Sequence, residues 1–149
     1  MLKTSLSRLT DHLGSDLGHS NWIKIEQERI NAFAEVTEDR QWIHTDSERA
    51  ADGPFGNTIA HGYLTLSLVS VFLFDLLIVE DAGSIVNYGL NRVRFPSYVP
   101  VEASIRAHGQ LIDVTAAGSD LQTVIRMTIE TDRGAKPGMV ADVLTRFQP

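Results

Sequence analysis

The chain has 149 residues, of which 43% are hydrophobic and 21% charged, with a net charge of -6 and no cysteine. A chain of this length buries roughly 68–70% of the surface that its unfolded form exposes, so it can build a core without disulfides or metals. The lack of cysteine excludes disulfides and cysteine-based zinc or redox sites. The acidic balance argues against nucleic acid as a partner, because a duplex-binding surface needs clustered Lys and Arg.

We expect a single domain over residues 1–149, because no repeat, linker or charge block divides the chain. At its start, Leu2, Leu6, Leu9 and Leu13 fall on one helical face, and Gly14 follows as a stop. This spacing predicts an amphipathic helix rather than a targeting signal, because no apolar block is long enough for a signal peptide. We therefore expect a cytoplasmic protein, which the lack of cysteine also allows.

The next segments predict a short strand at 22–25 and a helix at 27–37, where apolar residues recur at helical spacing. From Glu38 to Asn57 this periodicity is lost, and Asp, Gly and Pro accumulate. Such a composition predicts a loop, with one helical turn around Ser47 to Ala51. Most of the chemically interesting polar side chains lie in this loop.

The most apolar segment of the chain runs from Gly62 to Val79. It is about as long as the roughly 17 to 25 residues of a membrane span. However, Asp75 lies inside it, hydroxyl side chains interrupt it, and no Lys/Arg cluster flanks it. We therefore predict a helix that the rest of the protein covers on nearly all sides, and no contact with a membrane.

The remaining half of the sequence predicts strands at 84–91, 92–95, 101–112, 121–130 and 139–147. In the clearest of these, apolar and polar residues alternate from Leu121 to Glu130, with Val124 as the exception. This alternation suits an antiparallel sheet with one covered and one exposed face. A long sheet together with one apolar helix predicts an α+β fold in which the sheet curls around the helix.

The side chains that can take part in catalysis or binding lie in two stretches: FAEVTEDRQWIHTD at 33–46 and FGNTIAHGYL at 55–64. The spacing of Asp39 and His44, followed by Ile59-Ala60-His61-Gly62, resembles the MaoC-like family of (R)-specific enoyl-CoA hydratases. The stretch NYGLNRVRFP at 87–96 is similar to that family as well. The resemblance covers the chain from about Trp22 onward. It implies the hot-dog fold, an antiparallel sheet wrapped around one long helix, and a homodimer with sites near the subunit interface.

The resemblance further implies that Asp39 and His44 form a catalytic pair. They would activate one water for addition to a trans-2-enoyl thioester of CoA or of an acyl carrier protein, and no cofactor or metal is implied. Hydration needs a base for the water proton and an acid that delivers a proton to C2, and such groups typically contribute about 10²–10⁴-fold in rate. Histidine titrates near neutrality, and a carboxylate beside it raises its basicity. The sequence leaves open which residue holds which proton.

Four further residues are carried over as substrate-binding. The backbone N–H of Gly62 matches the family's donor to the thioester carbonyl, where negative charge builds as the enolate forms. Ser70 matches a serine that supports the site in some relatives. The other two are Gln41 and Trp42, where the commoner pattern of the family has Asn and Pro. That pattern also has Gly in place of Glu38. A similar Gln-Trp pair occurs in the branch that resembles nodulation protein N and some actinobacterial 3-hydroxyacyl-thioester dehydratases.

Simpler interpretations stand beside these. A loop Asp and His five residues apart would ordinarily be a surface or capping pair, and only the second motif favours catalysis. His61 is expected to be structural, and the five histidines show no metal-binding spacing. Arg92 and Arg94 could meet CoA phosphates, but solvated charges are the simpler interpretation. The alternative functions are a hot-dog thioesterase and a non-catalytic acyl-thioester-binding protein.

Overall fold

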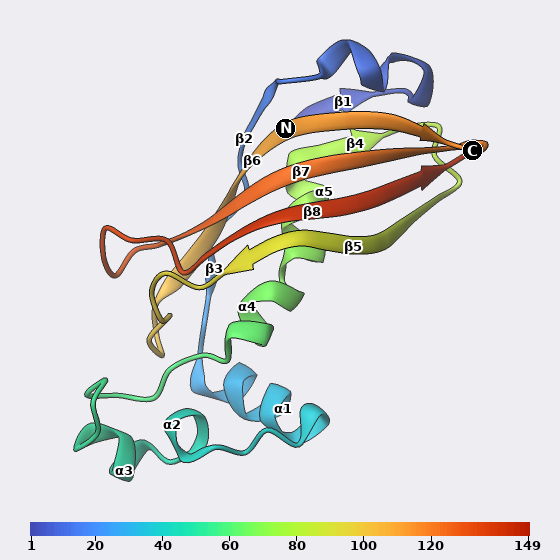
Figure 1. Cartoon of the computed structure of the whole chain (residues 1–149). Coiled ribbons are helices and arrows are strands. Elements are labelled where there is room, and N and C mark those ends of the chain that lie inside the picture. Colours follow the sequence, from blue (N-terminus) through green and yellow to red (C-terminus); the bar gives the residue numbers. More distant parts are fainter.

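The computed structural model describes residues 1–149, and its largest element is a six-stranded antiparallel sheet (Figure 1). The strands pair in the order β2-β6-β7-β8-β5, and β3 pairs with β6 beside β2. The sheet consists of β2 (Asp16–His19), β3 (Ile23–Lys24), β5 (Ser84–Arg94), β6 (Ser104–Ala117), β7 (Asp120–Thr131) and β8 (Met139–Gln148).

Two consecutive helices, α4 (Gly62–Ser67) and α5 (Val69–Leu76), lie against one face of this sheet (Figure 1). They meet at Leu68, whose backbone is still right-handed helical. Phe72 and Leu76 of α5 are fully buried in one core cluster with inward-facing residues of β7 such as Met127. A helix that is apolar on nearly all sides needs this covering, because any exposed side would leave apolar area in water. The predicted sheet curled around an apolar helix is confirmed.

Two expectations about this helix and the N-terminus are wrong in detail. The helix ends at Leu76, and Leu77–Val79 form strand β4, which pairs in parallel with β1 (Leu2–Thr4). The expected amphipathic helix of the first fourteen residues is instead β1 followed by the 3₁₀ helix η1 (Leu6–His12). With three residues per turn, Leu6 and Leu9 share one face, and Leu9 is fully buried. None of the helices has the length and hydropathy that a membrane crossing requires.

A small group of helices lies beyond the start of α4, at one end of the molecule (Figure 1). It consists of α1 (Gln27–Thr37), α2 (Trp42–Thr45) and α3 (Ser47–Ala51). The predictions of α1, of the turn at α3 and of strand β3 are confirmed, whereas α2 was not predicted because four residues are too few to show a period. The expected strands at 84–91 and 92–95 are one strand, β5, with two irregularities in its register against β8.

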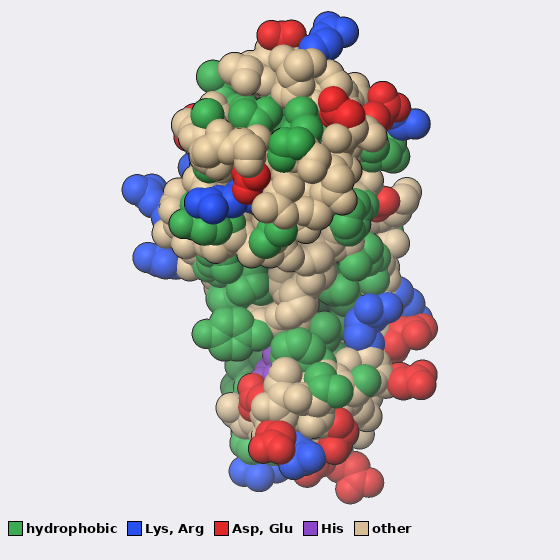
Figure 2. Space-filling view, turned by 90° about the vertical axis from the view of Figure 1, so that its right-hand side faces the viewer, with side chains coloured by type: hydrophobic (Ala, Val, Ile, Leu, Met, Phe, Trp, Pro, Cys, Tyr) green, Lys and Arg blue, Asp and Glu red, His purple; other side chains and the backbone are tan.

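Strand β5 forms an edge of the sheet, because it pairs with β8 on one side and with no strand on the other. Large hydrophobic side chains are exposed on β5 and on the neighbouring helices, and Figure 2 shows such side chains gathered on one face of the molecule. Those on the helices are Tyr63, Val71 and Phe74, and those on β5 are Val86, Tyr88 and Leu90. This side of the protein is therefore unusually apolar for a surface.

Candidate active site

The loop that carries the predicted catalytic pair begins with a backbone reversal at the end of α1. Glu38 has φ 63° and ψ 10°, which is the left-handed region. This conformation ends the helix and directs the next residue, Asp39, away from it. Glycine adopts it without steric cost, whereas a residue with a Cβ does not. This explains why the MaoC-like family, which the sequence resembles, commonly has a glycine at the position of Glu38.

His44 lies on α2 and is buried, with 7% of its surface exposed. Its Nδ1 donates to the backbone carbonyl of Ile59 at 2.7 Å. Because a carbonyl can only accept, Nδ1 carries the hydrogen and Nε2 is left as an acceptor. Burial lowers the pKa of His44 below its ordinary value, and the bond to Ile59 and the charge of Asp39 oppose this shift only in part. The bond to Ile59 thus fixes the orientation of the ring, and the lowered pKa favours its unprotonated form.

His61 directly precedes α4 and joins the two catalytic candidates. Its Nε2 donates to the backbone carbonyl of Asp39 at 2.9 Å. Its ring stacks on that of His44, with centroids 3.7 Å apart, and the ring of Phe33 lies 5.0 Å away. The other nitrogen, Nδ1, is buried without a hydrogen-bond partner. His61 thus holds the loop to the start of α4, as the sequence led us to expect.

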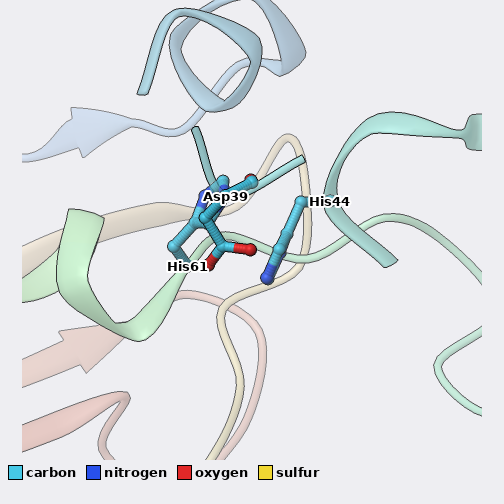
Figure 3. A group of neighbouring side chains, drawn as sticks. All are labelled: Asp39, His44 and His61. Carbon is cyan, nitrogen blue, oxygen red and sulfur yellow. The ribbon is translucent and has the colours of Figure 1, made fainter. Parts of the chain in front are cut away.

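The exposed carboxylate of Asp39 faces the two stacked rings (Figure 3). One side-chain nitrogen or oxygen from each of Asp39, His44 and His61 lies within 4.8 Å of the others, and no direct hydrogen bond joins the carboxylate to either ring. Two hydrogen bonds of about 2.8 Å that meet at one water span up to about 5 Å, so this separation is within the reach of one bridging water. A metal suits the group less well, because stacked rings direct their lone pairs side by side rather than toward one ion.

Beside these residues lies a pocket of about 280 Å³, lined by His44, Gly62, Phe95, Tyr98 and six further residues, the last of which along the chain is Gly138. Gly62 is the first residue of α4, so its N–H has no partner within the helix. A Cβ at this position would lie 3.3 Å from the ring of Phe95. The glycine therefore keeps open a narrow passage between the helix start and the aromatic ring, with a backbone donor exposed in it.

A second layer of hydrogen bonds supports the loop. The side-chain amide of Gln27 on α1 donates to the backbone carbonyl of His44 at 2.7 Å, and its oxygen accepts from the hydroxyl of Thr58. These bonds join α1, α2 and the segment before α4. Sequence reasoning missed Gln27 and Thr58, because a Gln on a helix and a Thr in a loop carry no signal of their own.

Three of the predicted substrate-binding residues lie apart from this pocket. The hydroxyl of Ser70 on α5 accepts from Asn87 at 3.1 Å and lines a different pocket, of about 250 Å³, between the helices and β5. Trp42 packs under the guanidinium of Arg49, 4.3 Å from its ring centroid. Gln41 is exposed at the start of α2. Of the four residues, only Gly62 lines the pocket beside His44, and the substrate-binding roles of all four stay predictions.

Comparison with known proteins agrees with this picture. The family described as MaoC like domain matches residues 8–133. The chain is 43% identical over 144 residues to 3-hydroxyacyl-thioester dehydratase Z of Mycobacterium tuberculosis, covering 96% of this chain and 95% of that protein. It is 40% identical to nodulation protein N of Rhizobium meliloti, covering 100% and 96%. The (R)-hydratase of A. caviae has the same hot-dog fold, with a TM-score of 0.70 at 19% identity, over 92% of this chain and 96% of that one.

The match to the family covers most of the sequence, and it includes the loop with Asp39 and His44 and the start of α4. The relatives are similar over nearly their whole length. The chain therefore belongs to the MaoC-like dehydratase family, whose members have the hot-dog fold seen here.

Proposed function

We propose that the protein catalyses the reversible, (R)-specific addition of water to trans-2-enoyl thioesters, which gives (R)-3-hydroxyacyl thioesters. The observation that carries the proposal is that side-chain atoms of Asp39 and His44 lie within 4.8 Å of each other, beside a pocket that Gly62 lines with a backbone N–H unpartnered within its helix. The names of the relatives support it, because one is a 3-hydroxyacyl-thioester dehydratase and a protein of the same fold is an (R)-hydratase.

In the proposed reaction, Asp39 and Nε2 of His44 hold the water. Nε2 accepts one water proton as the oxygen bonds to C3 of the substrate, and the electron pair of the double bond moves toward the thioester carbonyl. The N–H of Gly62 donates to the carbonyl oxygen as its negative charge grows, which typically contributes about 2.7–4 kcal/mol. The protonated His44 then returns the proton to C2. Water is added overall, and the enzyme is regenerated.

Turnover of crotonyl-CoA tests the proposal, followed by the loss of enoyl-thioester absorbance and by the stereochemistry of the product. Wild type should form the (R)-3-hydroxy product, and Asp39→Asn and His44→Ala should each lower kcat by about 10²–10⁴-fold. Asp52 is exposed and His12 is half-buried, and neither lines the pocket beside His44. They provide matched controls, and Asp52→Asn and His12→Ala should be as active as wild type.

The alternatives give different products. Release of free thiol would identify a thioesterase, and binding without turnover would identify an acyl-thioester-binding protein. If crotonyl-CoA and longer enoyl-CoA substrates are left unchanged but enoyl thioesters of an acyl carrier protein react, the reaction stands and the carrier is corrected. If no enoyl thioester of either carrier reacts, the proposed function is wrong.

The functional unit in this proposal is a homodimer. The free edge of β5 and the exposed hydrophobic side chains on α4, α5 and β5 lie on one side of the protein, and a second copy would cover both. Phe74 is 56% exposed on α5 and makes a suitable probe. Phe74→Glu should convert the dimer to a monomer in light scattering, whereas the same change at exposed Val36 on α1 should not. A monomeric wild type would contradict this part.

A further inference from the structure

A hollow on the outer face of the sheet is surrounded by arginine side chains. Arg92 and Arg94 of β5, Arg126 of β7 and Asp142 of β8 line it, and its volume is about 330 Å³. In the strand register, Arg92 lies opposite Asp142, and Asp142 lies opposite Arg126, so the three form one row across the sheet. Arg126 is exposed between two buried neighbours, which places this row on the face away from the core. We name this hollow the arginine pocket.

The charges of the arginine pocket are only partly compensated. Arg126 donates two hydrogen bonds to the carboxylate of Asp142, at 2.8 and 3.0 Å. By contrast, no carboxylate lies within ion-pair distance of Arg92 or Arg94, and the only side-chain bond of either is from Arg94 to the carbonyl of Val93. The pocket therefore carries two uncompensated positive charges, although the whole chain has a net charge of -6. Such neighbouring like charges repel each other until an anion binds between them.

The arginine pocket adjoins the active-site pocket at one end of β5 and β8. Arg94 directly precedes Phe95, whose ring faces Gly62, and Val140 of the arginine pocket follows Gly138 of the active-site pocket by two residues. Because a strand rises about 3.3 Å per residue, the backbone of Arg92 lies only about 10 Å from that of Phe95.

This arrangement fits the carrier end of a CoA thioester. CoA bears a pyrophosphate and a 3′-phosphate, and a flexible pantetheine arm separates them from the thioester sulfur. The planar guanidinium group matches the geometry of phosphate oxygens and can bind them through two parallel bonds. A hollow of about 330 Å³ also suits a nucleotide better than the convex surface of a folded carrier protein.

We propose that the arginine pocket binds the phosphate groups of CoA while the enoyl chain occupies the pocket beside His44. The inference rests on the proposed function for the thioester, and it adds the recognition of the carrier. Arg92 and Arg94 make the phosphate contacts, because their charges are free. Arg126 and Asp142 hold each other and shape the wall of the pocket.

A comparison of two substrates tests this inference. Crotonyl-CoA carries the phosphates, whereas the crotonyl thioester of N-acetylcysteamine carries only the end of the arm next to the sulfur. The double variant Arg92→Ala/Arg94→Ala should raise KM for crotonyl-CoA about tenfold or more, because two charged contacts are lost. It should leave kcat for both substrates and KM for the short thioester within about twofold of wild type, since the reacting atoms are untouched.

The control variant removes the same number of positive charges elsewhere. Lys3 and Arg8 lie together at the N-terminal strand and η1, away from both pockets. Lys3→Ala/Arg8→Ala should leave both KM values unchanged, which separates a local contact from an effect of net charge. If the arginine double variant raises KM for both substrates alike, or for neither, the inference is wrong. If it impairs only the enoyl thioester of an acyl carrier protein, the pocket serves a protein carrier and the inference is also wrong.

Binding of adenosine 3′,5′-bisphosphate, measured by calorimetry, tests the arginine pocket independently of turnover. Wild type should bind this nucleotide end of CoA, and the arginine double variant should not, while its Tm stays that of wild type. Nucleotide binding that is lost in the variant supports the inference even if no substrate reacts, in which case only the proposed function fails. Absence of binding to wild type, together with normal turnover, overturns the inference and leaves the proposed function intact.

Discussion

The imidazole rings of His44 and His61 stack with centroids 3.7 Å apart and planes inclined by 24°. The same His61 ring donates to the backbone of Asp39. One buried side chain therefore fixes the position of both groups that we assign to catalysis, without itself being assigned a contact with substrate.

Two substitutions separate the two contacts of His61. His61→Gln keeps a donor for the Asp39 carbonyl and loses the stacked ring, whereas His61→Phe keeps a ring and loses the donor. Because a displacement of about 1 Å at a catalytic group costs about 10²-fold, we expect each variant to lower kcat by about 10–10²-fold with little change in KM. Steady-state kinetics on folded protein, checked by circular dichroism, measures this. Wild-type kcat in both variants would show that His61 has no positioning role.

The pH dependence of activity follows from the environment of His44. Burial lowers the pKa of His44 below 6.5, so the unprotonated base persists to lower pH than for an ordinary histidine. Activity is lost as pH falls through this lowered pKa, because protonated His44 cannot accept the water proton. The acid limb of kcat/KM should therefore have its midpoint below pH 6.5. A midpoint above 6.5 would contradict the assignment.

The charge of Asp39 acts on His44 in the opposite direction to burial, since it raises the pKa. Removing that charge in Asp39→Asn should lower the pKa of His44 further. Titration of the His44 ring protons by NMR measures this in wild type and variant, and it does not require activity. A pKa that rises, or does not move, would mean that the carboxylate does not face the ring in solution.

The left-handed backbone at Glu38 predicts a stabilising substitution. Glu38→Gly should raise the free energy of unfolding by about 1 kcal/mol, because a Cβ is unfavourable at φ 63° and glycine has none. For a protein of this size the corresponding rise in Tm is about 2–4 °C. Glu38→Ala is the matched control, since it removes the carboxylate but keeps the Cβ, and it should give no such rise. An equal rise in both variants would trace the effect to the charge.

Gly62→Ala tests the narrow passage at the start of α4. The added methyl group would lie 3.3 Å from the ring of Phe95 and would crowd the pocket beside the exposed N–H. We expect kcat/KM to fall by about 10–10²-fold while Tm changes little, because the crowding acts at the site rather than in the core. If the ring causes the loss, Phe95→Leu in the same chain should restore part of the activity. Full activity of Gly62→Ala alone would refute the assignment.

The parts of the fold that could be predicted from sequence are those with a regular period. The face of β7 with Ile125, Met127 and Ile129 is fully buried as the alternation predicts, and Val124 is buried on the other face as its apolar side chain suggests. The same reasoning failed at the N-terminus, because Leu2, Leu6 and Leu9 fit both an α-helix and a strand followed by a 3₁₀ turn. Only the pairing of β1 with β4, 75 residues away, decides between them.

For the candidate site, the sequence indicated Asp39, His44 and Gly62 through two motifs that resemble those of the MaoC-like family. It could not show the stack of His61 on His44 or the bond from His44 to Ile59, because both depend on how the loop folds back on itself. It also could not show that Ser70 lies with Asn87 in a separate pocket. Spacing along the chain locates residues on elements, whereas contacts between loops are decided by tertiary packing.

The shape of β5 also affects how the protein behaves at high concentration. An edge strand of eleven residues offers a row of unpaired backbone groups to any other extended chain. In β5 this row is interrupted by two register irregularities, near Asn87/Gly89 and Leu90/Arg92, and it ends in two arginines. Irregular pleating and terminal charge both disfavour continued strand addition. The edge thus resists the open-ended stacking of strands that leads to fibrils.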